Sequence, residues 1–394
     1  PDDFWALLQA CWSYIDVFAS DILEARHEVR EQKKTFDKLP VVDGYGTINP
    51  LLKQHFESPR AFVPLHTSNS GPGNEGDINW EGISLLVPFR KKGRSAIVSP
   101  GMRLRHQIVV DAIERGVPLR YGTIDKTPKS IISLDGVSAP WRNGFDKTSV
   151  AFEITKLRVA CFIFISALSM MRLSEVAGLR CGALTTHFGA PAVKAKVYKK
   201  HHAAGKTAYW WVSQPVAKAI RIAESIAERE GLLFRSPKYP DKTMDHSDEI
   251  RRFVEWINTI GPSRGLRTIT DTAISTHRLR RTMSIITAAQ PDGEIALGIT
   301  LKHNATRALA NSVTSGYGAP TPAWEAELHL EQQRAKAAEL VSKWSKRKDG
   351  NLQLAGPGAK SFQELMRQTE TTPEAIPLTG TARTLRNLLR DPAS

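Results

Sequence analysis

Cysteine is scarce in this sequence, and the few cysteines are far apart. Cys11, Cys161 and Cys181 are the three cysteines among 394 residues, and no two of them form a CxxC pair. A disulfide framework or a cysteine-ligated zinc site needs several cysteines at short, regular spacings. The pattern therefore argues against both, and it favours a protein of the reducing cytoplasm that holds no structural metal.

Long apolar runs and targeting segments are also missing. The longest apolar run, VACFIFISALSMM, covers residues 159–171. A helix needs about 20 apolar residues to cross a bilayer, so we expect no membrane span. No secretory signal peptide is visible. The first residue is Pro1 rather than methionine, and we expect further residues to precede it.

Acidic residues are fewer than basic ones. The sequence has 40 Asp and Glu residues against 54 Lys and Arg residues, which gives a formal net charge of +14. Such an excess favours polyanionic partners, because each Lys or Arg that meets a phosphate releases a condensed counterion. A cationic membrane-binding protein would share this charge, but no amphipathic basic helix dominates the sequence.

The remaining sequence is a series of helical patterns with one strand-like region. The length predicts two or three domains, and a hydrophobic content of 41% is sufficient for globular packing. Between residues 40 and 101, Pro and Gly separate short β-like runs, of which residues 83–89 (ISLLVPF) are one. Residues 192–214 alternate like two strands, with a turn at residues 203–205. Helices are predicted over residues 3–36, 102–115, 146–171, 215–230, 247–258, 276–289 and 324–344.

The first group of candidate functional residues surrounds Arg172, in the segment ALSMMRLSEVAGL. Arg172 lies where a long apolar helix gives way to a second helix. An arginine there presents a rigid fork of donors beside the positive end of a helix dipole, and both suit a phosphate oxygen. Glu175, three residues later, is placed to brace the guanidinium. The alternative is an ordinary surface Arg–Glu pair at helical spacing.

The second group lies in the segment THRLRRT, residues 276–282. His277 and Arg280 are three residues apart and therefore share one helical face. Arg278 and Arg281 share a neighbouring face, which is expected to contact water or a DNA backbone. An HxxR pair is common by chance, so this segment is not specific by itself.

The third group is the segment LKHNATRALANSVTSGY, residues 301–317. His303 follows an apolar stretch, and Tyr317 follows Ser315 and Gly316. A buried tyrosine with a satisfied hydroxyl is the common alternative. A tyrosine nucleophile needs help from its neighbours, because a phenol with a pKa of about 10 is mostly protonated at neutral pH.

In chain order, the pattern Arg…His-x-x-Arg…His…Tyr resembles the catalytic domain of the tyrosine recombinase (phage integrase) family. The family's A-x-T-G-x-R-x-x-E-x-x-x-L motif is matched by Ala167, Arg172, Glu175 and Leu179, with Met170 in place of the glycine. Its H-x-L-R-x-T box is matched by His277, Leu279, Arg280 and Thr282. Its L-G-H box is matched by Leu301 and His303, with Lys302 in place of the glycine. Tyr317 follows His303 at a longer interval than in compact family members.

This resemblance implies DNA strand transfer without a metal ion, ATP or another cofactor. Arg172, Arg280 and His303 would surround the non-bridging oxygens of the scissile phosphate. Tyr317 would attack the phosphorus and form a 3′-phosphotyrosine. His277 would assist the proton transfer from the tyrosine or orient the phosphate.

The family also carries a lysine on a β-hairpin between the two arginines, which protonates the departing 5′-oxygen. In this sequence Lys206, at the start of the second predicted strand, is the better match. Lys199 and Lys200, at the end of the first predicted strand, are the alternatives.

The resemblance further implies the partners and the domain organisation. The expected partners are double-stranded DNA near the nucleoid, further copies that form a homotetramer on two DNA sites, and accessory DNA-bending proteins. The implied fold is α+β, mainly helical with a small antiparallel sheet, in which a helical DNA-binding region precedes a recombinase-like catalytic domain. Residues 1–145 would hold the end of a core-binding region with a linker or insertion, residues 146–325 the catalytic domain, and residues 326–394 a helical tail. A type IB topoisomerase, a telomere resolvase and an inactive DNA-binding relative are the alternatives.

Overall fold

The computed structural model describes residues 2–69, 73–93, 96–197, 205–227, 230–236, 239, 241–271, 273–290, 293–301, 360, 362–364 and 367. The chain divides into two compact units. The first comprises residues 1–284 and 298–304, and the second comprises residues 285–297 and 305–394. No helix in the described ranges is long and apolar enough to cross a membrane.

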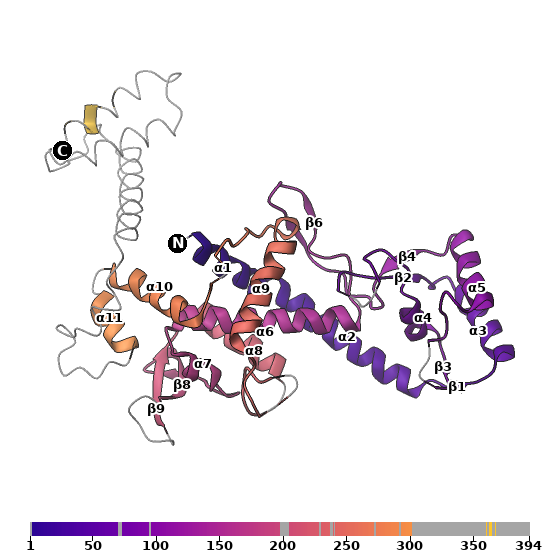
Figure 1. The fold of residues 1–394 in the computed structure, drawn as a ribbon, viewed down its shortest axis with the longest axis horizontal. Helices are drawn as coiled ribbons and strands as arrows, with labels where there is room; N and C mark the ends of the chain where they lie inside the picture. The colour runs from indigo at the N-terminus through magenta and orange to yellow at the C-terminus, as the bar shows by residue number, and fades with distance from the viewer. Residues whose placement is uncertain are drawn as a thin grey trace. The chain divides into compact units, whose positions relative to one another are not determined.

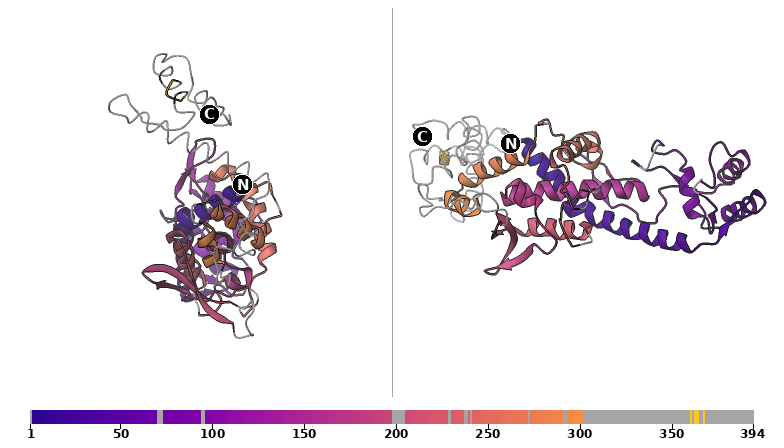
Figure 2. Two further views of the ribbon diagram at one scale, coloured as in Figure 1. Left: turned by 90° about the vertical axis from the view of Figure 1, so that its left-hand side faces the viewer. Right: turned by 60° about the horizontal axis from the view of Figure 1, so that its bottom comes forward.

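The chain begins with a long helical segment that packs against a helix far along the sequence. The segment consists of α1 (Asp2–Trp12), a π-helical stretch (Ser13–Phe18) and α2 (Ala19–Lys38), which confirms the predicted helix over residues 3–36. Each of the three stretches contacts α6 (Lys147–Ser169), and Figures 1 and 2 show them side by side. The start of the chain therefore shares a core with α6.

A buried polar cluster joins this N-terminal segment to the rest of the first unit. Glu153 of α6, which is fully buried, accepts hydrogen bonds from Arg142 Nη1 at 2.9 Å, Arg264 Nη2 at 3.2 Å and Tyr14 Oη at 3.1 Å. The Tyr14 hydroxyl in turn accepts a hydrogen bond from Trp256 Nε1 at 2.9 Å. The π-helical stretch thus places Tyr14 where it connects α6 with α9 (His246–Ile260).

Residues 40–145 contain a separate hydrophobic cluster built on short elements. Ile48, Leu52, Val63, Ile83 and Val109 are among its fully buried members. The strands form three pairs, β1–β3 and β2–β4 parallel and β5–β6 antiparallel. The elements are β1 (Val41–Val42), α3 (Tyr45–Glu57), β2 (Val63–Leu65), α4 (Trp80–Leu86), β3 (Arg90–Lys91), α5 (Arg103–Glu114), β4 (Leu119–Tyr121), β5 (Ser130–Ile132) and β6 (Ser138–Pro140).

Two predictions made for this region have different outcomes. The predicted helix over residues 102–115 is confirmed by α5, and Gly116 follows it with a φ of 91°. The β-like interpretation of residues 83–89 is wrong, because most of this run belongs to α4. Asn79 starts that helix, since its side chain accepts a hydrogen bond from the Gly82 N–H at 2.8 Å.

The helix α6 is the central element of the rest of the first unit. Asp146 caps its N-terminus by accepting hydrogen bonds from the Thr148 and Ser149 N–H groups, both at 2.9 Å. The predicted helix over residues 146–171 is confirmed, and every residue from Val159 to Ala167 is buried. A short helix, α7 (Leu173–Ala177), follows directly.

A three-stranded antiparallel sheet lies beside α7 and α8 (Gln214–Ala227) in Figure 1. Its strands are β7 (Leu184–His187), β8 (Ala190–Val197) and β9 (Lys206–Trp211), in the order β7-β8-β9. The two predicted strands are confirmed as β8 and β9, whereas β7 was not predicted. The α+β class, mainly helical with a small antiparallel sheet, is therefore confirmed, and two short parallel pairs are added to it.

The last described elements are helical. A short 3-10 turn (Pro262–Arg264) follows α9, and α10 (Thr276–Ala288) and α11 (Gly293–Thr300) come next. The helices predicted over residues 215–230, 247–258 and 276–289 are confirmed by α8, α9 and α10. The helix predicted over residues 324–344 lies outside the described residues.

Candidate active site

The turn between α6 and α7 places Arg172 at the start of a helix. Met170 ends α6 with a φ of 53°, in the left-handed region that glycine favours. This is the position at which the recombinase motif has a glycine. Arg172 then adopts an extended conformation with a ψ of 155° and becomes the N-cap of α7.

Glu175 fixes the Arg172 side chain. Its carboxylate accepts a hydrogen bond from the Arg172 backbone N–H at 2.6 Å and from Arg172 Nη1 at 2.9 Å. The Glu175 side chain is 2% exposed and that of Arg172 is 23% exposed. A guanidinium carries five N–H donors, of which Glu175 engages one. The carboxylate thus holds the guanidinium in one orientation beside the first turn of α7.

Arg280 comes from α10, which contacts the end of α6 through Ser284 and Met170. Ser284, one turn after Arg280, donates a hydrogen bond to the Arg280 carbonyl oxygen at 2.8 Å, and its Oγ lies 3.8 Å from Met170 Sδ. Because Met170 is two residues before Arg172, this contact brings the Arg280 face of α10 close to the α6–α7 junction. Arg280 is 4% exposed. His277, on the first turn of α10, is exposed.

The two neighbouring arginines of α10 differ in their surroundings. Arg278 forms an ion pair with Asp271, with contacts of 2.8 and 3.2 Å, and Arg278 Nη1 also donates a hydrogen bond to the Ala273 carbonyl oxygen at 2.7 Å. Arg281 is exposed and has no ion pair within the part of the chain that the structure describes. Sequence reasoning missed Asp271, because it lies in the loop before α10, outside the helix that carries Arg278.

Lys206 is the first residue of β9 and pairs with Val197, the last residue of β8. Its side chain is exposed. Strand alternation places it on the same face as Trp210, which is 1% exposed and points into the protein. The alternative lysines, Lys199 and Lys200, lie outside the described residues.

His303 and Tyr317 also lie outside the described residues. The last described residue before them, Leu301, is buried. The structure therefore joins Arg172 to Glu175 and places Ser284, one turn after Arg280, against Met170. The positions of His303 and Tyr317 stay predictions.

Two further features help to delimit the site. Within the described ranges, no group of three or more His, Cys, Asp or Glu side chains is arranged to hold a metal ion.

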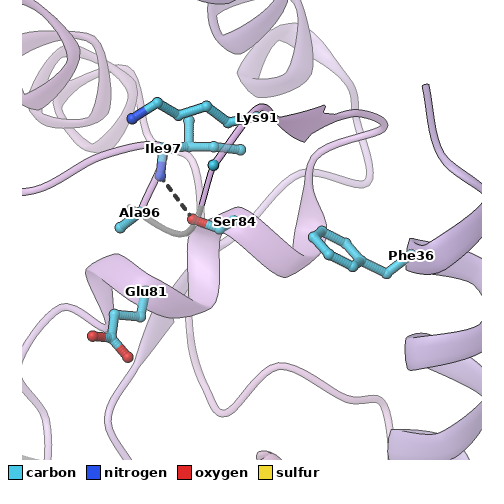
Figure 3. Close-up of a pocket in the computed structure, with 7 residues that line it drawn as sticks. Phe36, Glu81, Ser84, Lys91, Ala96 and Ile97 are labelled. Atoms are coloured by element: carbon cyan, nitrogen blue, oxygen red, sulfur yellow. Dashed lines mark hydrogen bonds between the residues drawn. The ribbon is translucent and has the colours of Figure 1, made fainter. Parts of the chain in front are cut away.

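A pocket of about 330 Å³ lies away from the candidate residues (Figure 3), and none of them lines it. Ser84 Oγ in its wall accepts a hydrogen bond from the Ile97 N–H at 3.0 Å. The residues that line it are Phe36, Glu81, Ser84, Lys91, Gly93, Ala96 and Ile97.

Comparisons with known proteins found similarity to a solved structure. No family model matches the chain, and no curated protein sequence matches it. Among solved structures, the chain is similar to the Tn1549 transposon integrase, which was solved in complex with circular intermediate DNA. The match has 16% identity and a TM-score of 0.29, and it covers 58% of this chain and 76% of the other. A TM-score of this size does not establish a shared fold, so the assignment of function rests on the residues of the chain itself.

Proposed function

We propose that the protein is a site-specific DNA recombinase or integrase, which cleaves and rejoins DNA strands through a 3′-phosphotyrosine at Tyr317. The observation that best supports this is the α6–α7 junction, where Glu175 orients Arg172 and Ser284, one turn after Arg280, contacts Met170. Two guanidinium forks on converging elements suit the non-bridging oxygens of a single phosphate. The order of the candidate residues along the chain indicates that Tyr317 is the nucleophile.

In the proposed first step, the Tyr317 hydroxyl oxygen attacks phosphorus in line and the bond from phosphorus to the 5′-oxygen breaks. Arg172, Arg280 and His303 stabilise the charge of the pentacoordinate transition state. Lys206 gives its proton to the departing 5′-oxygen, and His277 assists the loss of the phenol proton or orients the phosphate. A 5′-hydroxyl from another strand then reverses the step. Because the phosphotyrosine conserves the energy of the phosphodiester, the scheme requires no ATP. Two arginines supply the positive charge that a metal ion gives other nucleases, so no metal ion is required.

The proposed reaction implies which molecules the protein binds. The substrate is double-stranded DNA, and the exchange of strands between two duplexes requires four active sites, so we propose a homotetramer assembled on two DNA sites. Accessory DNA-bending proteins would help to form this complex. Residues 326–394 would contact a neighbouring protomer from the C-terminal side of the catalytic domain.

The test is to trap the covalent intermediate. DNA that crosslinks to the protein is first sequenced to find its target, and a target duplex nicked close to the scissile phosphate is then prepared. The released 5′-hydroxyl fragment diffuses away, so a covalent complex should accumulate in the presence of EDTA, and peptide mass spectrometry should locate the DNA on Tyr317. A complex that requires a divalent metal ion, or DNA attached to another residue, would refute the proposal. Relaxation of a supercoiled plasmid that lacks the target would favour a topoisomerase instead.

The candidate arginines allow a matched comparison. Arg172→Ala and Arg280→Ala should each lower the rate of covalent complex formation by roughly 100- to 1000-fold at saturating DNA, as expected for the loss of one transition-state donor. Arg278→Ala and Arg281→Ala should mainly weaken binding and reduce its dependence on salt concentration. Single-turnover rates and binding isotherms at several salt concentrations separate the two effects. Equal losses of rate in all four variants would contradict the assignment.

The role of Lys206 is tested with a substrate whose leaving group needs no proton. A 5′-bridging phosphorothiolate replaces the departing oxygen with sulfur, and a thiolate leaves without an acid. Lys206→Ala should cleave normal DNA slowly and cleave the phosphorothiolate at close to the wild-type rate. The matched control is Lys200→Ala. If the sulfur substrate restores Lys200→Ala and not Lys206→Ala, Lys200 is the acid.

A further inference from the structure

The sheet β7-β8-β9 has one covered face and one open face. Val193 and Trp210 lie on the covered face and are fully buried, where α7 and α8 contact the sheet. On the other face, the register pairs Lys194 with Tyr209 and Lys196 with Thr207, and both lysines are exposed. We name this second surface the outer sheet face.

Aromatic rings gather along one end of the outer sheet face. The rings of His187 and Tyr209 stack with a centroid distance of 4.2 Å and an interplanar angle of 7°. Trp211 lies 5.5 Å from the same His187 ring, and Trp211 Nε1 donates a hydrogen bond to the His187 carbonyl oxygen at 3.1 Å. Phe188 continues the group at 4.4 Å from His187. Phe188 is 86% exposed and Trp211 is 44% exposed.

The backbone of Phe188 adopts a conformation that is unfavourable for a phenylalanine. Phe188 and Gly189 form the two-residue turn between β7 and β8, with φ values of 50° and 76°. Positive φ at both positions is typical of a type I′ hairpin turn, for which Asn-Gly is the preferred sequence. A bulky side chain in the left-handed region is strained, and a phenyl ring that is 86% exposed gains little from burial. Local stability therefore favours asparagine at this position, and the turn itself gives no reason for the phenylalanine.

The sequence that forms the sheet carries charge of one sign. Residues 176–223, which include the whole sheet, contain eight Lys or Arg residues and no Asp or Glu. Lys194 and Lys196 present two of these charges on the outer sheet face, next to the aromatic rings. The surface is therefore complementary to an anionic partner that also has flat rings to stack.

We propose that the outer sheet face binds unpaired nucleotides of a DNA strand. The bases stack on Phe188 and Trp211, and the phosphates between them contact Lys194 and Lys196. Stacked aromatic side chains and a basic track are the features by which proteins hold single strands without sequence preference. The bases of a duplex have their faces covered by neighbouring base pairs, so the partner is a single strand. This binding goes beyond the proposed strand transfer, because it does not involve Tyr317.

The test uses the full chain and a fluorescein-labelled thymidine oligonucleotide in an anisotropy titration. Phe188→Asn should weaken binding roughly 5- to 100-fold, in the range for loss of one stacked base, while leaving the Tm unchanged or higher. Trp211→Ala should weaken it to a similar degree. The matched control is Trp5→Ala, since Trp5 of α1 is 46% exposed and lies outside the sheet; it should leave the affinity unchanged. Substitution of both Lys194 and Lys196 by Gln should reduce the salt dependence of binding.

Two outcomes would overturn this inference. One is that Phe188→Asn and Trp211→Ala bind the oligonucleotide as tightly as the wild type does. The other is that duplex DNA binds more tightly than the single strand and loses affinity by the same factor, which would assign the face to duplex phosphates. The experiments distinguish failure of this inference from failure of the strand-transfer proposal. If only the strand-transfer proposal fails, the protein still binds the oligonucleotide but forms no adduct at Tyr317.

Discussion

Replacement of Tyr317 by phenylalanine is expected to abolish the covalent protein–DNA complex and to leave DNA binding unchanged. The substitution removes one oxygen atom, which in the proposed reaction forms the bond to phosphorus. No other tyrosine lies between Tyr317 and Ser394, so this stretch offers no rival nucleophile. Binding depends instead on phosphate contacts made by lysine and arginine side chains, and these contacts stay in place.

Two measurements on the same nicked duplex test this prediction. Anisotropy gives the affinity, and a denaturing gel gives the fraction of protein bound covalently to DNA. Tyr239→Phe is the matched control, because Tyr239 is 51% exposed and lies in the loop before α9; it should retain full covalent activity. Covalent DNA in the Tyr317→Phe variant would end the assignment of Tyr317 as the nucleophile.

The second large effect is on stability. Glu153→Ala is expected to lower the free energy of unfolding by about 3–5 kcal/mol, as removal of one partner of a buried ion pair does. The substitution leaves two buried guanidinium groups, those of Arg142 and Arg264, without their carboxylate. Burial lowers the pKa of Arg142 and the Glu153 charge opposes that effect, so the arginine depends on this carboxylate. Burial also raises the pKa of the Tyr14 phenol, which is therefore protonated and donates to Glu153.

Urea unfolding followed by tryptophan fluorescence measures this effect, and a second ion pair serves as the control. Asp16 and Lys218 also connect the N-terminal segment to the rest of the unit, at 2.6 Å, but their side chains are 42% and 44% exposed. Because water screens this pair, Asp16→Ala should cost less than about 1 kcal/mol. If Glu153→Ala costs no more than Asp16→Ala, the buried cluster does not stabilise the fold.

Elements with local signals could be predicted from the sequence. The helix α6 combines a capping aspartate, Asp146, with a long apolar run, and its bounds were predicted to within two residues. The helix α10 and the β8–β9 hairpin also follow from local periodicity. The run at residues 83–89 was misinterpreted because a short apolar segment fits a strand or a buried helix equally well. In the structure, the Asn79 side chain caps the N-terminus of this segment, which is helical.

The candidate site could be predicted only where its contacts are local. The spacing of three residues between Arg172 and Glu175 predicted a brace, and the structure contains this hydrogen bond. The contact between Met170 and Ser284 joins residues 114 positions apart, and no sequence pattern indicates it. The buried cluster around Glu153 is of the same kind, because its members come from separate elements and become neighbours only in the fold.

The long N-terminal helical segment has a consequence for the synthesis of the protein. Its partners are made late, since Tyr14 contacts Arg264 across 250 positions and Asp3 accepts a hydrogen bond from Thr270 across 267. A ribosome adding roughly 5–20 residues per second takes about 10–50 s to cover that distance. The hydrophobic cluster formed within residues 48–112 is complete much earlier. The nascent chain therefore carries an apolar helix without its partner while the following region folds, and a fragment that starts at residue 146 would leave α6 without the helix that covers it.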